Sequence, residues 1–157
     1  MGAKLVIAID WDNQTRMDLA RKLGADVVLG KDNDIVQTIL SHTNGQGVDN
    51  SCEFSGSPNA LTNTIHSTRM GGYVNILSVY GNPMTEIPMN EVVFRYLHVK
   101  GINGRKMWST WDKMHELLSD GKIDIDTLVT HRIGFQEFPD GIKLAMSGDC
   151  GKVIMDF

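Results

Sequence analysis

The feature that most constrains the fold of this chain is the alternation, from its first residues onward, of short apolar runs with segments of helical periodicity. Residues 4–9 are one lysine followed by five apolar residues, as expected for a strand buried on both faces of a parallel sheet. Further strands are expected at 26–29, 48–54 and 73–80, within 92–102, and at 128–133 and 152–155. This order predicts an α/β fold with a mostly parallel, doubly wound sheet and right-handed crossovers.

Helical segments fill the spaces between these strands, and several begin at capping residues. The candidate caps are Asp12 or Asn13, Asp32 or Asn33, and Ser57, which Pro58 follows. The apolar stripe of the helix after Ser57 extends to Met70, so this helix is expected to end before the glycine pair at 71–72. Two later helices are expected over 108–118 and 138–146.

The charge balance narrows the possible partners. Fifteen Lys and Arg against nineteen Asp and Glu give a net charge of −4 over 157 residues, which argues against nucleic acid and anionic membranes. No apolar run approaches the ~20 residues of a membrane span, and the first residues do not form a signal-peptide core. We therefore expect a soluble, cytoplasmic chain with neither a nucleic-acid nor a membrane partner.

The cysteines and histidines give no sign of a metal site. Cys52 and Cys150 are too far apart for a C-x-x-C motif, and none of the five histidines stands at metal-ligand spacing from another histidine or cysteine. Free thiols in a reducing compartment are therefore expected. Cys52 is expected to act as a small hydrophobe inside a buried strand, whereas Cys150 stands in a glycine-rich turn, where it could be exposed.

Asp10 is the sharpest candidate for a binding residue. Ligands of open α/β sheets bind outside the carboxyl ends of the strands, and an acid at this place can accept hydrogen bonds from the ribose hydroxyls of a dinucleotide. Asp10 alone leaves a second interpretation equally open, in which it only caps the next helix. The glycine-rich phosphate-binding fingerprint usually lies ~20 residues before such an acid. It is therefore expected to precede Met1, and the sheet to lack its first strand and glycine-rich loop.

Almost the whole chain resembles the coenzyme-binding half and C-terminal tail of the zinc-dependent medium-chain dehydrogenases, most closely the threonine 3-dehydrogenase branch. The resemblance is carried by residues 6–10, by Arg16 with 19–26, by 47–49 with 53–56, by 101–105 with 108–111, and by 130–132. It implies a Rossmann-like domain over residues 1–129. It also implies that residues 130–157 form a tail that in the family returns to the catalytic domain.

The resemblance also assigns residues to an NAD site. It implies that Asp10 holds the adenosine ribose and that Arg16 lies beside the adenine end. Val79, Ile102 and Asn103 match positions that line the nicotinamide side. No catalytic and no metal-binding residue is assigned within this chain, because the family's zinc ions are held by an N-terminal domain that these residues do not resemble. Zinc is thus expected in the parent family only.

These expectations lead to one functional hypothesis with two alternatives. The chain is expected to be the NAD-binding fragment of an oxidoreductase that converts threonine and NAD to 2-amino-3-oxobutanoate, inactive by itself. The alternatives are a stand-alone Rossmann-like module that binds a nucleotide or a partner, and a fragment of a related polyol or alcohol dehydrogenase.

Without the first strand, two inner strand edges would be open. A partner chain could cover them, giving a dimer or higher homo-oligomer, or the two halves of the sheet could pair directly.

Overall fold

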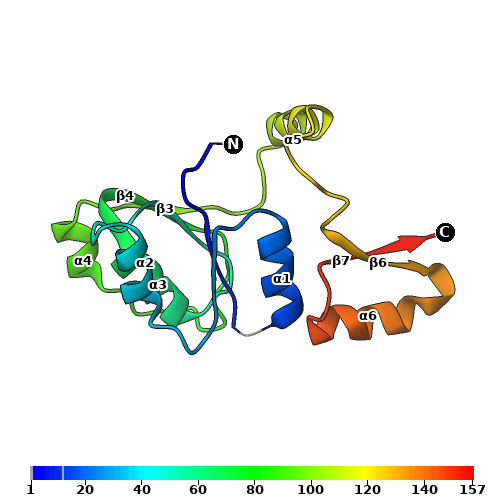
Figure 1. Cartoon of the computed structure of the whole chain (residues 1–157), viewed down its shortest axis with the longest axis horizontal. Helices are drawn as coiled ribbons and strands as arrows, with labels where there is room; N and C mark the ends of the chain where they lie inside the picture. Colours follow the sequence, from blue (N-terminus) through cyan, green and yellow to red (C-terminus); the bar gives the residue numbers. More distant parts are fainter. Residues whose placement is uncertain (1, 12) are drawn as a thin grey trace. The chain divides into compact units, whose positions relative to one another are not determined.

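The computed structural model describes residues 2–11 and 13–157. Its elements follow the expected alternation (Figure 1). In chain order they are β1 (Ile7–Ile9), α1 (Gln14–Lys22), β2 (Val27–Leu29), α2 (Ile35–His42), β3 (Val48–Glu53), α3 (Pro58–Ser67), β4 (Thr68–Ile76), α4 (Met89–Phe94), β5 (His98–Gly101), α5 (Ser109–Ser119), β6 (Val129–Gly134), the short 3₁₀ helix η1 (Phe135–Glu137), α6 (Phe138–Ser147) and β7 (Lys152–Asp156). Every strand pairing among the described residues is parallel, which confirms the α/β class.

The chain divides into two compact units, and each is described here by itself. The first unit, Met1–Asp32 with Lys106–Phe157, contains the two-stranded sheets β1–β2 and β6–β7. The second unit, Asn33–Arg105, contains the three-stranded sheet β3–β4–β5. Among the described strands, β1 pairs only with β2 and β3 only with β4, so each has one edge without a strand neighbour. The expected boundary between residues 129 and 130 stays a prediction.

The second unit has a small apolar core beneath α3. Leu61 and Ile65 of α3 are buried together with Val74 of β4 and with Leu97, which precedes β5. Helix α3 packs against β3 and β4, and α2 packs against α3. The helix begins as expected, because the Ser57 side chain accepts a hydrogen bond from the Ala60 amide and Pro58 occupies the first turn.

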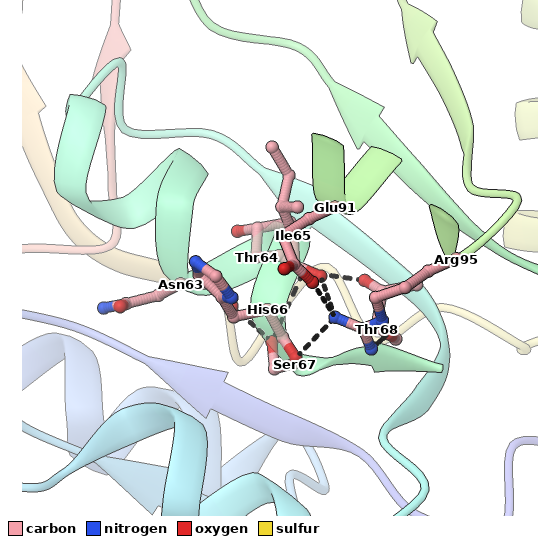
Figure 2. Close-up of polar contacts among 8 residues, drawn as sticks. All are labelled: Asn63, Thr64, Ile65, His66, Ser67, Thr68, Glu91 and Arg95. Carbon is pink, nitrogen blue, oxygen red and sulfur yellow. Dashed lines mark hydrogen bonds and ion pairs between the residues drawn. The ribbon is translucent and has the colours of Figure 1, made fainter. Parts of the chain in front are cut away.

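The C-terminal end of α3 differs from the expectation. The helix ends at Ser67 rather than near Met70, and β4 begins at Thr68 instead of Tyr73. Figure 2 shows why: the Arg95 guanidinium donates hydrogen bonds to the carbonyl oxygens of Ile65, His66 and Thr68. These donors satisfy carbonyls that a helix end leaves without partners, so the chain passes directly from helix to strand without a glycine cap.

Two hydroxyl groups complete this helix end. The side chain of Thr68, fully buried, donates to the carbonyl of Thr64, and that of Ser67 donates to Asn63. The Thr68 hydroxyl also lies 2.6 Å from that of Ser51 on β3. Polar side chains therefore connect the end of α3 to the neighbouring strand.

The first strand is shorter and more exposed than expected. Strand β1 spans Ile7–Ile9 rather than residues 4–9, and Ile9 is 52% exposed, so this strand is not buried on both faces. The reason is that β1 has a single described strand neighbour and belongs to a sheet of two strands. Helix α1 is capped by Asn13, as expected, while the alternative cap Asp12 lies outside the described residues.

Three further expectations were wrong in detail. The cap of α2 is Asp34, whose side chain accepts from the Gln37 amide, and not Asp32 or Asn33. Cys52 is exposed, because its neighbour Ser51 pairs with Val74, which packs against α3, and the next residue of the strand points to the opposite face. Cys150 is buried and its thiol donates to the Leu144 carbonyl.

Candidate functional site

The carboxyl end of β1 holds the first two predicted site residues together. The Arg16 Nε lies 3.2 Å from the Asp10 Oδ2, and the two side chains are 51% and 24% exposed. The other Asp10 oxygen accepts a hydrogen bond of 3.0 Å from the Asn13 amide. Asp10 is therefore not itself the helix cap, a place that Asn13 takes, but it supports the turn that leads into α1.

The turn before α1 also contacts a distant segment of the same unit. The Asn13 side-chain amide donates to the Gly148 carbonyl at 3.0 Å. Gly148 ends α6 in the left-handed conformation, with φ of 78°, and a β-carbon there would lie 3.2 Å from the Asn13 side chain. Residues near the end of the chain thus pack beside the Asp10–Arg16 pair.

The remaining predicted site residues lie in the second unit, after two neighbouring strands. Val79 follows β4 and is 89% exposed. Ile102 follows β5, and its amide donates to the Ile76 carbonyl at the end of β4 at 2.8 Å. Asn103 comes next and is exposed. Parallel strands bring their carboxyl ends to one edge of a sheet, so these three residues share the edge where ligands of such sheets bind.

Sequence reasoning assigned no role to the most elaborate polar group of this edge, the Glu53 carboxylate at the end of β3. Glu53 is only 2% exposed. One carboxylate oxygen accepts from the Ser55 amide at 2.7 Å and from the Ser55 hydroxyl at 2.6 Å. The Gly56 amide donates to both oxygens at 3.2 Å, and the second oxygen also accepts from the Tyr80 hydroxyl at 2.8 Å and from the Ser78 hydroxyl.

These hydrogen bonds decide the charge of the buried carboxyl group. Burial by itself raises the pKa of Glu53, but the hydrogen bonds from Ser55, Ser78 and Tyr80 outweigh it and lower the pKa to about 2. Burial and the neighbouring Glu53 charge in turn raise the pKa of the Tyr80 phenol. The sequence signal that could have revealed this group is an acid at the end of a strand, followed within three residues by Ser55 and Gly56.

The described side chains do not fit a zinc ion. Across residues 2–11 and 13–157, no group of three or more His, Cys, Asp or Glu side chains could hold a metal. A zinc site needs at least three protein ligands in one place.

The parallel β/α order defines a Rossmann-like class of fold. A family model described as zinc-binding dehydrogenase matches residues 1–120. The chain therefore belongs to the zinc-binding dehydrogenase family, which confirms the resemblance seen in the sequence.

Individual relatives agree with this assignment. An L-threonine 3-dehydrogenase of Bacillus licheniformis is 41% identical over 155 residues, which are 98% of this chain and 44% of that protein. The solved structure of 2R,3R-butanediol dehydrogenase from Bacillus subtilis is 28% identical, with a TM-score of 0.89 over 99% of this chain and 44% of that one. The solved structure of a zinc-binding dehydrogenase from Sinorhizobium meliloti 1021, bound to NADP, is 28% identical. Its TM-score is 0.79, over 90% of this chain and 42% of that one. The chain thus spans less than half the length of these proteins.

Proposed function

We propose that this chain supplies the NAD-binding part of an oxidoreductase similar to the threonine 3-dehydrogenases. The observation that carries the proposal is the position of Asp10, ion-paired to Arg16 at the carboxyl end of β1, in a chain of the zinc-binding dehydrogenase family. A carboxylate at this place accepts hydrogen bonds from the ribose hydroxyls of the cofactor, and its charge disfavours the additional 2′-phosphate of NADP.

When bound, NAD would supply the hydride acceptor for the proposed reaction, in which C3 of threonine would lose a hydride and its hydroxyl a proton to give 2-amino-3-oxobutanoate. Val79 and Ile102 would offer apolar side chains to the nicotinamide ring, and the backbone around Asn103 would offer polar groups to the carboxamide. The similarity to threonine 3-dehydrogenases, at 41% identity, favours threonine over a diol such as butanediol, for which the similarity is 28%. Because the chain covers 44% of its relatives and offers no described zinc ligands, we expect no turnover by the chain alone.

NAD binding tests the proposal directly. Nuclear magnetic resonance titration of the chain with NAD should move the amide signals of Asp10 and its neighbours, with weak affinity, because the 157 residues contain no G-x-G-x-x-G phosphate loop. Asp10→Asn should weaken NAD binding about tenfold, because hydrogen bonds to a charged acceptor are lost. It should weaken NADP binding less.

The matched control is Asp18→Asn, which changes an exposed carboxylate on α1 that pairs with Arg21. This variant should bind NAD like the wild type. A chain whose Asp10 signals do not respond to NAD, or in which both variants bind equally, would refute the proposal. Tight binding measured by calorimetry would contradict the expectation that affinity depends on a phosphate loop.

We also propose that the chain forms a homo-oligomer and works in the cytoplasm. All four residues of β5 are exposed, and β5 has only β4 as a strand partner in the described part of the chain, so its outer edge is open to a second copy. Both cysteines are free, in keeping with a reducing compartment. Light scattering that finds only monomers at all concentrations would exclude the oligomer. In the described residues, no helix is long and apolar enough to cross a membrane.

A further inference from the structure

The buried Glu53 carboxylate has no part in the function proposed above, although it is the most heavily hydrogen-bonded side chain at this sheet edge. A carboxylate has about four acceptor sites, and donors from Ser55, Gly56, Ser78 and Tyr80 occupy this one. Glu53 therefore has no free lone pair with which to take a proton from a substrate or to bind a ligand. Its effect must act through the groups that it holds.

Two of these donors flank a predicted cofactor residue. Ser78 and Tyr80 come from the segment after β4, and both side chains turn inward to the same Glu53 oxygen. Val79 stands between them and is 89% exposed. With Ser78 and Tyr80 both fixed inward by Glu53, the residue between them is the exposed one.

The backbone of the Glu53 turn fixes the same segment sterically. Gly56 has a φ of 73°, and a β-carbon on it would lie 2.6 Å from the Val79 carbonyl oxygen. Only glycine permits this approach, because any side chain would displace either the turn or the carbonyl. The Ser78–Tyr80 segment is thus held by two side-chain hydrogen bonds and by direct backbone packing.

We propose that Glu53 is a positioning residue for the nicotinamide side of the cofactor site, which holds residues 78–80 so that Val79 faces the ring. This inference rests on the proposed function, because it assigns Val79 to the nicotinamide. It predicts that disturbing Glu53 impairs recognition of the nicotinamide half of NAD and leaves the adenosine half, at Asp10, unaffected.

Two ligands separate the halves: nicotinamide mononucleotide and ADP-ribose. Binding of each to the 157-residue chain is measured by nuclear magnetic resonance titration. Glu53→Gln replaces one acceptor oxygen by an amide group that cannot accept from Ser78 or Tyr80. We expect it to weaken binding of nicotinamide mononucleotide at least about tenfold, while ADP-ribose binding stays within about twofold. The matched control Asp49→Asn, an exposed acid on the same strand, should change neither.

A second variant allows the same test if the Glu53→Gln chain does not fold. Tyr80→Phe removes a single donor, and it should show the same preferential loss of nicotinamide mononucleotide binding to a smaller degree. The inference is overturned if both variants bind nicotinamide mononucleotide like the wild type. It is equally overturned if they lose both ligands in the same proportion, since a purely structural role would act on both halves.

The wild-type chain distinguishes failure of this inference from failure of the proposed function. Binding of ADP-ribose without nicotinamide mononucleotide would overturn the role of Glu53 and leave the assignment of Asp10 in place. Binding of neither ligand would overturn the proposed function and, with it, this inference.

Discussion

Replacing Arg95 by alanine should remove the donors that close the C-terminal end of α3. In the wild type, one Arg95 nitrogen lies 3.2 Å from the Ile65 carbonyl oxygen and 3.1 Å from that of His66, and the other donates to Thr68. The positive charge also opposes the partial negative charge at the end of the helix dipole. The variant removes the Arg95 donor from three carbonyls at a buried helix end.

The size of the effect follows from these contacts. A hydrogen bond from a charged donor contributes about 1.5–3 kcal/mol. Two of the three carbonyls share one nitrogen, and the Arg95 side chain is 21% exposed, so water replaces part of the loss. We therefore expect Arg95→Ala to lower the free energy of unfolding of the second unit by about 3 kcal/mol. Arg95→Lys keeps the charge but not the fork-shaped set of donors, and should cost about half as much.

Glu91→Gln is the matched control, because it removes the other partner of Arg95. Their closest atoms are 3.7 Å apart and Glu91 is 42% exposed, so this ion pair should contribute at most about 0.5 kcal/mol. A Glu91→Gln variant as destabilised as Arg95→Ala would show that the ion pair, and not the helix end, accounts for the stabilisation.

The assay must report on the second unit alone. All three tryptophans of the chain lie outside residues 33–105, so tryptophan fluorescence follows the other unit. Amide hydrogen exchange of α3 and β4, measured by mass spectrometry, reports directly on the affected elements. Unchanged exchange protection of α3 in Arg95→Ala would refute the reasoning.

Three further predictions concern other parts of the molecule. The pKa of Glu53 is about 2 in the folded chain against an ordinary 4.5. Since the folded value is the lower one, the ionised Glu53 stabilises the fold fully above about pH 5. About 3 kcal/mol of the free energy of unfolding is then lost as the pH falls toward 2. Acid unfolding followed by hydrogen exchange should show this loss, and Glu53→Gln should remove it. Gly72→Ala would place a β-carbon 2.5 Å from the Thr68 methyl group and should cost about 2 kcal/mol or more in urea unfolding, whereas Gly101→Ala, which meets nothing within 4 Å, should be nearly neutral. Asn13→Ala removes the cap of α1 and should destabilise the first unit by about 1 kcal/mol, measured by tryptophan fluorescence.

The order and type of the elements could be predicted because they depend on local periodicity. Apolar spacing and the Ser57–Pro58 start identified α3, and short apolar runs located the strands. Burial could not be predicted in the same way, because it depends on what covers each face. Cys52 is expected to be buried and is exposed, since it points away from the face on which Val74, the partner of Ser51, packs against α3.

The polar network around Glu53 could not be predicted for a related reason. Its donors Ser78 and Tyr80 are 25 and 27 residues away along the chain, and they meet the carboxylate only because β3 and β4 pair in a particular register, with Glu53 opposite Ile76. A shift of one residue would turn these side chains to the other face of the sheet. Arg95 is 27 residues from Thr68 and likewise reaches it only in the folded chain. Residues after strand ends can therefore be predicted as ligand contacts from sequence alone. The residues that hold them in place can be identified only when the pairing register of the strands is known.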